Sequence, residues 1–209
     1  DRTPDYTYPS CGGIAENGCS WTQCSVDDVA FSAALVQKVS ANVCIDSDRV
    51  YAVGGSNGGM FVWDLGRDER SAEVFRAVAP ILGLPHRGYL DPPVSESGMP
   101  VISITGSRDR TVPPGEWGQD TFTTTSDGDV YYYSSASAIT KVWAEAHGCD
   151  ATVPAEPVDI GSSSMECRGW SYCLSDSQWP PVMDCRGNMG HVYNLSSSWP
   201  LILDFFEQL

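Results

Sequence analysis

Apolar residues recur at helical spacing in four stretches of this chain. The first covers residues 26–39 and carries Asp27 and Asp28 in its first turn, where the helix dipole favours anions. Its pattern predicts a helix of about four turns. A second helix is predicted to begin near Asn57, and a third to cover residues 136–146. A fourth is predicted over residues 199–206, with Pro200 near its first turn.

Three short apolar runs predict strands. They cover residues 49–53, 77–82 and 101–105, and each is followed by a glycine. Continuous apolar runs of this length are typical of buried strands in a parallel sheet. Because helices alternate with these strands, we expect an α/β layered fold in a single domain over residues 1–209. Two segments show little periodicity and are predicted to be irregular: residues 1–25 and 150–190. The stretch 113–129 is polar and Gly-rich.

The composition favours a folded acidic domain. Hydrophobic residues make up 42% of the 209 positions, enough to bury a sizeable core. Asp and Glu total 27 against 12 Lys and Arg, for a formal charge of −15, which repels phosphate backbones and anionic lipid. We therefore expect neither nucleic acid nor a membrane surface as a partner. No apolar run approaches the roughly 18 residues that a membrane-spanning helix needs.

Eight cysteines indicate an oxidising compartment. They stand at positions 11, 19, 24, 44, 149, 167, 173 and 185, without any C-x-x-C pair that would suggest zinc or redox chemistry. We expect four disulfides in a secreted protein and no metal or other cofactor, whereas a cytosolic chain with buried free thiols is the alternative. Spacing leaves the pairing open. A glycan acceptor at Asn194 agrees with secretion.

The sequence GGSNG at residues 54–58 is a G-x-S-x-G motif between a predicted strand and a predicted helix. In a nucleophile elbow this turn is so tight that the positions flanking the serine must lack side chains. Ser56 would then be presented to substrate in a strained conformation, with the main-chain N–H of Asn57 directed at a developing oxyanion. The alternative is a glycine-rich turn without catalysis.

A serine nucleophile needs a general base, and this chain has three histidines. His191 follows a flexible-looking polar loop and precedes the last predicted helix, which is where an α/β-hydrolase places its base. His147 is explained by its place at a helix C-terminus. His86, in a turn-like segment, is expected at the surface and is a minor candidate.

The base in turn needs an acid to orient it, and two aspartates qualify. Asp109 follows the strand at residues 101–105, so it lies at the sheet edge where a site would be built. A surface ion pair with Arg108 or Arg110 is its alternative role. Asp184 is close to His191 in sequence but has no evident strand context. We therefore prefer Asp109.

These residues resemble the secreted esterase family that contains polyhydroxybutyrate depolymerases and feruloyl or acetylxylan esterases. The resemblance covers about 180 residues, from Val26 to the C-terminus. It implies an α/β-hydrolase-like parallel sheet, with Ser56 as nucleophile, Asp109 as acid, His191 as base, and hydrolysis through an acyl-enzyme. The matching segments are residues 26–31, 48–51, 54–60, 75–80, 106–113, 143–149, 190–191 and 198–200.

One departure from the family concerns the N-terminal strands. In an α/β-hydrolase several strands precede the nucleophile strand, but only 55 residues precede Ser56 here. We expect the chain to be the C-terminal part of a longer precursor, with an unpaired sheet edge that invites pairing. The expected partner is an N-terminal polypeptide chain that supplies these strands, with Cys11, Cys19 and Cys24 available for a disulfide link.

The sequence thus predicts a secreted serine esterase that acts on polymer-linked or small carboxylic esters of hydroxyalkanoate, feruloyl or acetyl type. The alternative is a non-catalytic binding or structural module on a hydrolase scaffold, assembled with another chain. The substrate-binding residues stay open, because the aromatic residues at 117, 131–133, 170, 172 and 179 fit either a substrate cleft or the core.

Overall fold

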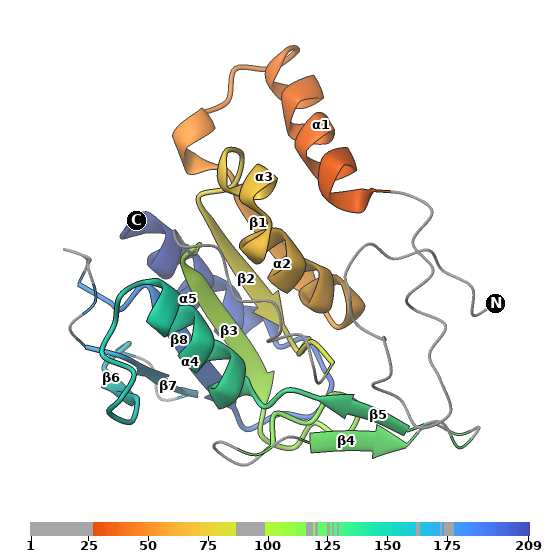
Figure 1. Ribbon diagram of the computed structural model, residues 1–209, viewed down its shortest axis with the longest axis vertical. Helices are drawn as coiled ribbons and strands as arrows, with labels where there is room; N and C mark the ends of the chain where they lie inside the picture. Colours follow the sequence, from red (N-terminus) through yellow and green to blue (C-terminus); the bar gives the residue numbers. More distant parts are fainter. Residues whose placement is uncertain are drawn as a thin grey trace.

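The computed structural model describes residues 27–209, apart from 87–98, 116–118, 120, 125, 127, 129, 162–163, 172 and 174–177. It contains a six-stranded sheet in the order β1-β2-β3-β8-β7-β6 (Figure 1). Strands β1, β2, β3 and β8 run parallel, whereas β7 and β6 are antiparallel additions beyond β8. The predicted α/β class is confirmed at this level. Residues 1–25 lie outside the described part.

The elements follow one another along the chain as α1 (Asp28–Ser40), β1 (Tyr51–Gly55), α2 (Asn57–Arg67), α3 (Glu69–Ala72), β2 (Ala77–Ile81), β3 (Val101–Gly106), β4 (Thr121–Thr124), β5 (Val130–Tyr133), α4 (Ala136–Ala146), β6 (Glu156–Val158), β7 (Met165–Gly169), β8 (Val182–Gly187) and α5 (Leu195–Glu207). A short 3₁₀ turn, η2 (Ser47–Arg49), precedes β1. None of the described helices is both long enough and apolar enough to cross a bilayer.

Two apolar cores lie on opposite faces of the sheet. Helices α1, α2 and α4 contribute to the first, in which the indoles of Trp63 and Trp143 meet edge to face with ring centroids 4.9 Å apart. Helix α5 covers the other face (Figure 1), and its Phe205 belongs to the second core together with residues of the strands. Burial of both sheet faces explains why β2 and β3 are continuous apolar runs.

The four predicted helices and the two interior strands are confirmed, with differences at their ends. Asp27 is the N-cap of α1, its carboxylate accepting the N–H of Ala30 at 2.9 Å, rather than a first-turn residue. Helix α5 begins at Leu195, so Pro200 lies inside the helix and not in its first turn. Strand β1, which we expected to be buried, is only partly buried, because among the described strands it pairs with β2 alone.

The prediction of irregular structure over residues 150–190 is wrong, because this segment supplies β6, β7 and β8. β8 pairs with β3 at the centre of the sheet, although it contains the charged residues Asp184 and Arg186. Their mutual contact, Arg186 Nη2 to Asp184 Oδ2 at 3.4 Å, lets both enter the interior. The polar, Gly-rich stretch 113–129 contains β4, which pairs with β5.

The described cysteines form two disulfides, Cys149–Cys173 and Cys167–Cys185. The second joins the paired strands β7 and β8. Cys44 is exposed and carries no disulfide, so the expectation that all eight cysteines pair is wrong at this residue. Cys11, Cys19 and Cys24 lie outside the described residues.

Candidate active site

Ser56 occupies a tight turn between β1, which ends at Gly55, and α2, which begins at Asn57. Its backbone angles are φ 52° and ψ −119°, in the positive-φ region that L residues rarely adopt. A residue held there stores about 1–3 kcal/mol of strain. The Ser56 N–H donates to the Ile81 carbonyl at 2.8 Å, and its carbonyl accepts from Met60 N–H at 3.0 Å, which together hold the turn.

The two glycines of the motif have different roles. A Cβ on Gly54 would overlap the Gly58 carbonyl and lie 2.7 Å from Val62 Cγ2, so this position cannot carry a side chain without moving backbone. A Cβ on Gly58 would meet nothing within 4 Å. The expectation that both flanking positions must lack side chains therefore holds at Gly54 and is wrong at Gly58.

Gly54→Ala is accordingly expected to lower the free energy of unfolding by about 1–3 kcal/mol, the usual cost of forcing an extra carbon into a packed site. Gly58→Ala is the matched control, since it adds the same atom in open space within a helix, where alanine is preferred over glycine. Urea unfolding of both variants measures the difference. Equal destabilisation by the two substitutions would contradict this account of the turn.

The structure brings His191 and Asp109 to Ser56. Ser56 Oγ lies 3.0 Å from His191 Nε2, and His191 Nδ1 lies 2.7 Å from Asp109 Oδ2. With Nδ1–H donating to the carboxylate, Nε2 is left to accept the serine hydroxyl proton. The Asp109 side chain is fully buried, whereas that of His191 is 21% exposed and so reachable from solvent.

Asp109 is held in place by its own turn. It follows β3, and its Oδ1 accepts the N–H groups of Thr111 at 2.8 Å and Val112 at 3.0 Å. Oδ2 is thereby directed to His191. Arg108 instead donates to the Asn188 carbonyl at 2.8 Å. The alternative of a surface ion pair for Asp109 does not fit a buried carboxylate that contacts His191.

The loop that carries His191 is tied to the loop that carries Asp109. Ser107 N–H donates to the Gly187 carbonyl at 2.9 Å, and Arg108 N–H donates to the Met189 carbonyl at 3.0 Å. Gly106 permits this close approach, because a Cβ there would lie 2.5 Å from Met189 O. The loop expected to be flexible is therefore anchored by main-chain hydrogen bonds. These bonds fix the positions of Asp109 and His191 relative to each other.

The other two histidines lie elsewhere. His86, expected at the surface, is completely buried beside the rings of Tyr131 and Tyr133, at centroid distances of 5.5 and 5.2 Å. Burial lowers the pKa of His86 to about 4. His147 is the C-cap of α4, and burial lowers its pKa as well.

Asp184, the competing acid, points to a different partner. It lies in β8 rather than in an irregular segment, it is wholly inaccessible to solvent, and its contact is with Arg186. Burial raises the pKa of Asp184 to about 6, with Arg186 opposing the shift. Asp184 is therefore a structural carboxyl of the sheet and not the group that orients His191.

The raised pKa of Asp184 predicts a pH-dependent stability. Between about pH 4 and 6 the folded protein holds a proton that the unfolded chain has released, so the free energy of unfolding falls as pH rises through this window. Asp184→Asn cannot titrate, so the total fall in its free energy of unfolding across this window should be smaller by up to about 3 kcal/mol. Asp64, whose pKa burial raises to about 7, contributes the same trend in both proteins. Urea unfolding from pH 4 to 7.5 tests this, and identical slopes would contradict it.

Sequence reasoning missed Tyr193 as a residue of the site. A Cβ on Gly55 would overlap the Tyr193 ring and lie 2.9 Å from its hydroxyl, so the ring rests directly against the residue that precedes Ser56. The ring is 6.4 Å from that of His191 and is half exposed. The sequence signal that could have identified Tyr193 is an aromatic residue two positions after His191.

Of the candidate cleft aromatics, Tyr131, Tyr133 and Trp170 are buried, while Trp117 and Tyr172 lie outside the described residues.

A main-chain N–H group also lies next to Ser56. Asn57 is the first residue of α2, so its N–H lies at the positive end of the helix dipole, next to Ser56.

Within the described ranges, no three His, Cys, Asp or Glu side chains gather in a way that could hold a metal ion. Neither a protein-family model nor a curated protein matches this chain.

Proposed function

We propose that this chain is a serine esterase, a carboxylic-ester hydrolase that uses Ser56, His191 and Asp109. The observation that carries the proposal is the continuous hydrogen-bonded series from Ser56 Oγ through both ring nitrogens of His191 to Asp109. Nucleophile, base and orienting acid in this geometry are the working parts of acyl transfer, whatever fold supports them. The positive φ of Ser56 is a second support, because strained turns of this kind present nucleophiles.

The reaction has two halves. Ser56 Oγ attacks the ester carbonyl carbon while His191 Nε2 takes the hydroxyl proton, and the resulting imidazolium is stabilised by Asp109. His191 then returns that proton to the leaving alkoxide, so that an alcohol departs and an acyl-Ser56 ester remains. In the second half His191 takes a proton from water, the hydroxide attacks the acyl-enzyme, and a carboxylic acid is released as Ser56 recovers its proton.

The tetrahedral oxyanion forms beside the N-terminus of α2. We assign Asn57 N–H as one donor to this oxygen, because it follows Ser56 directly and shares the positive end of the helix. A main-chain donor of this type is fixed before substrate arrives, so it costs no reorganisation during the reaction.

The arrangement of the sheet supports an α/β-hydrolase type of layering. Ser56 follows β1, Asp109 follows β3 and His191 follows β8, so all three stand at the carboxyl edge of parallel strands. This is the edge at which open α/β sheets build their sites. We further propose that the protein is secreted, because its disulfides suit an oxidising compartment.

The surface beside Ser56 favours an ester with an apolar or aromatic part. Tyr193 adjoins the turn, and Val192 and Leu195, which are close to Tyr193 in the sequence, are also exposed. Such a surface suits the feruloyl and hydroxyalkanoate esters suggested by the family resemblance better than a strongly charged substrate.

Hydrolysis of p-nitrophenyl butyrate and methyl ferulate by the purified chain tests the proposed function. We expect turnover of the nitrophenyl ester with a pre-steady-state burst of p-nitrophenol close to one equivalent, because this good leaving group makes acylation faster than deacylation. Folded protein without either burst or turnover would contradict it and would favour the non-catalytic module.

A further inference from the structure

Trp63 of α2 is completely buried, and it makes a directed contact with the turn that follows β2. Its indole Nε1–H donates to the Gly83 carbonyl at 2.9 Å. A buried indole N–H needs an acceptor, but many main-chain carbonyls would satisfy this need equally well. The choice of Gly83 matters because this residue touches the turn that carries the proposed nucleophile.

The main chain of Gly83 lies directly against that of Ser56. A Cβ on Gly83 would overlap the Ser56 carbonyl oxygen and lie 2.8 Å from Gly59 Cα, so no side chain fits between the two segments. The same carbonyl oxygen accepts the Met60 N–H at 3.0 Å, which is the first hydrogen bond of α2. Gly83 therefore limits where the Ser56 main chain and the start of α2 can lie.

The turn after β2 is itself strained. Gly55 pairs with Ile81 at the ends of the parallel strands β1 and β2, so Ser56 and Leu82 are the next residues of the two strands. Both have φ 52°, and they are the two non-glycine residues with positive φ in the part of the chain that the structure describes. The Leu82 N–H donates to the Ile104 carbonyl at 2.7 Å, and its side chain is buried in the second core. Strain of this kind persists only where the surroundings hold it, and it gathers at functional sites.

One face of α2 connects Trp63 to Ser56. Gly59 stands three residues after Ser56, and Trp63 stands four residues after Gly59, so the three positions lie on the same side of the helix. A Cβ on Gly59 would lie 3.1 Å from Gly83 Cα. Helix and turn therefore meet at two levels: the two glycine backbones close to the nucleophile, and the Trp63 hydrogen bond about one helical turn further along. Together these contacts oppose sliding and rotation of α2 against β2.

We propose that Trp63 is a positioning residue for the reaction of Ser56, an inference that rests on the proposed function. Its hydrogen bond holds α2 and the turn after β2 together. This contact fixes the Ser56 hydroxyl relative to His191, and the Asn57 N–H relative to the developing oxyanion. Displacement of reacting groups by about 1 Å can cost on the order of 100-fold in rate. Because the indole is completely buried, it acts through the main chain and does not touch the substrate.

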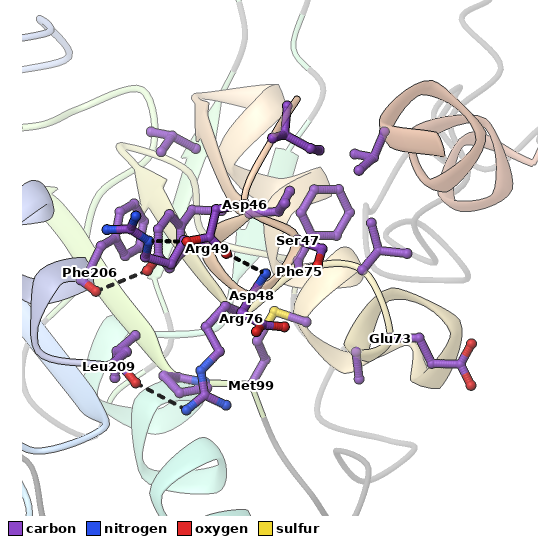
Figure 2. Close-up of a pocket in the computed structure, with 18 of the residues that line it drawn as sticks. Asp46, Ser47, Asp48, Arg49, Glu73, Phe75, Arg76, Met99, Phe206 and Leu209 are labelled. Carbon is purple, nitrogen blue, oxygen red and sulfur yellow. Dashed lines mark hydrogen bonds and ion pairs between the residues drawn. The ribbon is translucent and has the colours of Figure 1, made fainter. Parts of the chain in front are cut away.

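Trp143 of α4 provides a matched control. It is also completely buried, it meets Trp63 edge to face, and its Nε1–H donates to a main-chain carbonyl at the same distance of 2.9 Å. Its acceptor is Met99, which precedes β3 and so lies at the opposite edge of the sheet from Asp109. Met99 lines a groove that none of the three proposed catalytic residues reaches (Figure 2). The two indoles thus differ mainly in which main-chain segment they hold.

The test compares Trp63→Phe with Trp143→Phe, which remove the same N–H group and keep an aromatic ring in the core. Both variants should be less stable than the unmodified chain, since each loses a buried hydrogen bond. Fluorophosphonate labelling of Ser56, measured per folded protein, should slow at least about tenfold in Trp63→Phe and stay within about threefold in Trp143→Phe. The pH dependence of labelling should keep its midpoint in both variants, because the contact of His191 with Asp109 is left unchanged.

Amide hydrogen exchange reports on the same contact without any chemistry at Ser56. The Ser56 and Met60 N–H groups are hydrogen-bonded in this turn, at 2.8 and 3.0 Å. They should exchange at least about tenfold faster in Trp63→Phe than in Trp143→Phe. Gly83→Ala is a second variant, which keeps both indoles and forces the turn away from the Ser56 carbonyl, and it should slow labelling as well.

Two results would overturn the inference. The first is labelling of folded Trp63→Phe and Gly83→Ala as fast as that of Trp143→Phe, or equal slowing in the two tryptophan variants. The second is equal exchange of the Ser56 and Met60 amides in the two tryptophan variants, which would make Trp63 a core residue like Trp143. An unmodified chain that folds but takes up no label would instead contradict the proposed function, and the exchange rates would still decide whether Trp63 holds the turn.

Discussion

Replacing Ser56 with alanine is expected to abolish ester hydrolysis, lowering kcat by about 10⁶-fold. The reason is that His191 Nε2, now 3.0 Å from the serine oxygen, would have no nucleophile to deprotonate. Main-chain stabilisation of the oxyanion would remain, so a slow residual reaction above the background in water is compatible with the account. The measurement is the initial rate of p-nitrophenyl butyrate hydrolysis by the two proteins.

A companion variant separates loss of chemistry from loss of structure. Ser56→Ala keeps a side chain at φ 52° and should be about as stable as the unmodified chain, whereas Ser56→Gly removes the steric cost of that conformation. We expect Ser56→Gly to be equally inactive and more stable by about 1 kcal/mol. Retention of more than a few per cent of the activity in folded Ser56→Ala would remove Ser56 from the mechanism.

Asp109→Asn is expected to lower kcat by about 10⁴-fold. In the unmodified chain Oδ1 accepts two main-chain N–H groups, from Thr111 and Val112, while Oδ2 accepts the proton on His191 Nδ1. An asparagine would keep its carbonyl on the two N–H groups and turn its NH₂ to His191. Nδ1 would then have to accept, leaving the ring proton on Nε2, where it faces Ser56 and cannot remove the serine proton.

Asp184→Asn is the matched control for this substitution. It makes the same chemical change at the other candidate acid, which pairs with Arg186 instead of a histidine. We expect Asp184→Asn to keep kcat within about tenfold of the unmodified chain, and its main effect to be on stability. Should Asp184→Asn abolish hydrolysis while Asp109→Asn leaves it intact, the assignment of the acid would be wrong.

The elements around Ser56 could be predicted because several local signals agree there. A β-branched and aromatic run, a G-x-S-x-G turn and an amphipathic stretch follow one another, and the structure has β1, the turn and α2 in those places. The buried strands β2 and β3 were equally clear, since continuous apolar runs flanked by glycine have few other interpretations. The position of Asp109 could be predicted for the same reason, because it follows β3.

The parts that could not be predicted depend on contacts between distant residues. β8 contains Asp184 and Arg186, which read as loop residues until their ion pair and the Cys167–Cys185 disulfide are known. The exposure of β1 likewise follows from its place at the end of the sheet and not from its own sequence, which resembles that of a buried strand. Tyr193 enters the site only because the loop after β8 folds back against Gly55.

Labelling of the intact, non-reduced chain with a fluorophosphonate probe tests the central claim most directly, because the probe reports an activated serine without presuming a substrate. The account predicts about one equivalent of label, located at Ser56 by peptide mass spectrometry, absent in Ser56→Ala and much slower in Asp109→Asn. Folded chain that takes up no label, or takes it up at a different serine, would contradict the proposed nucleophile and its base.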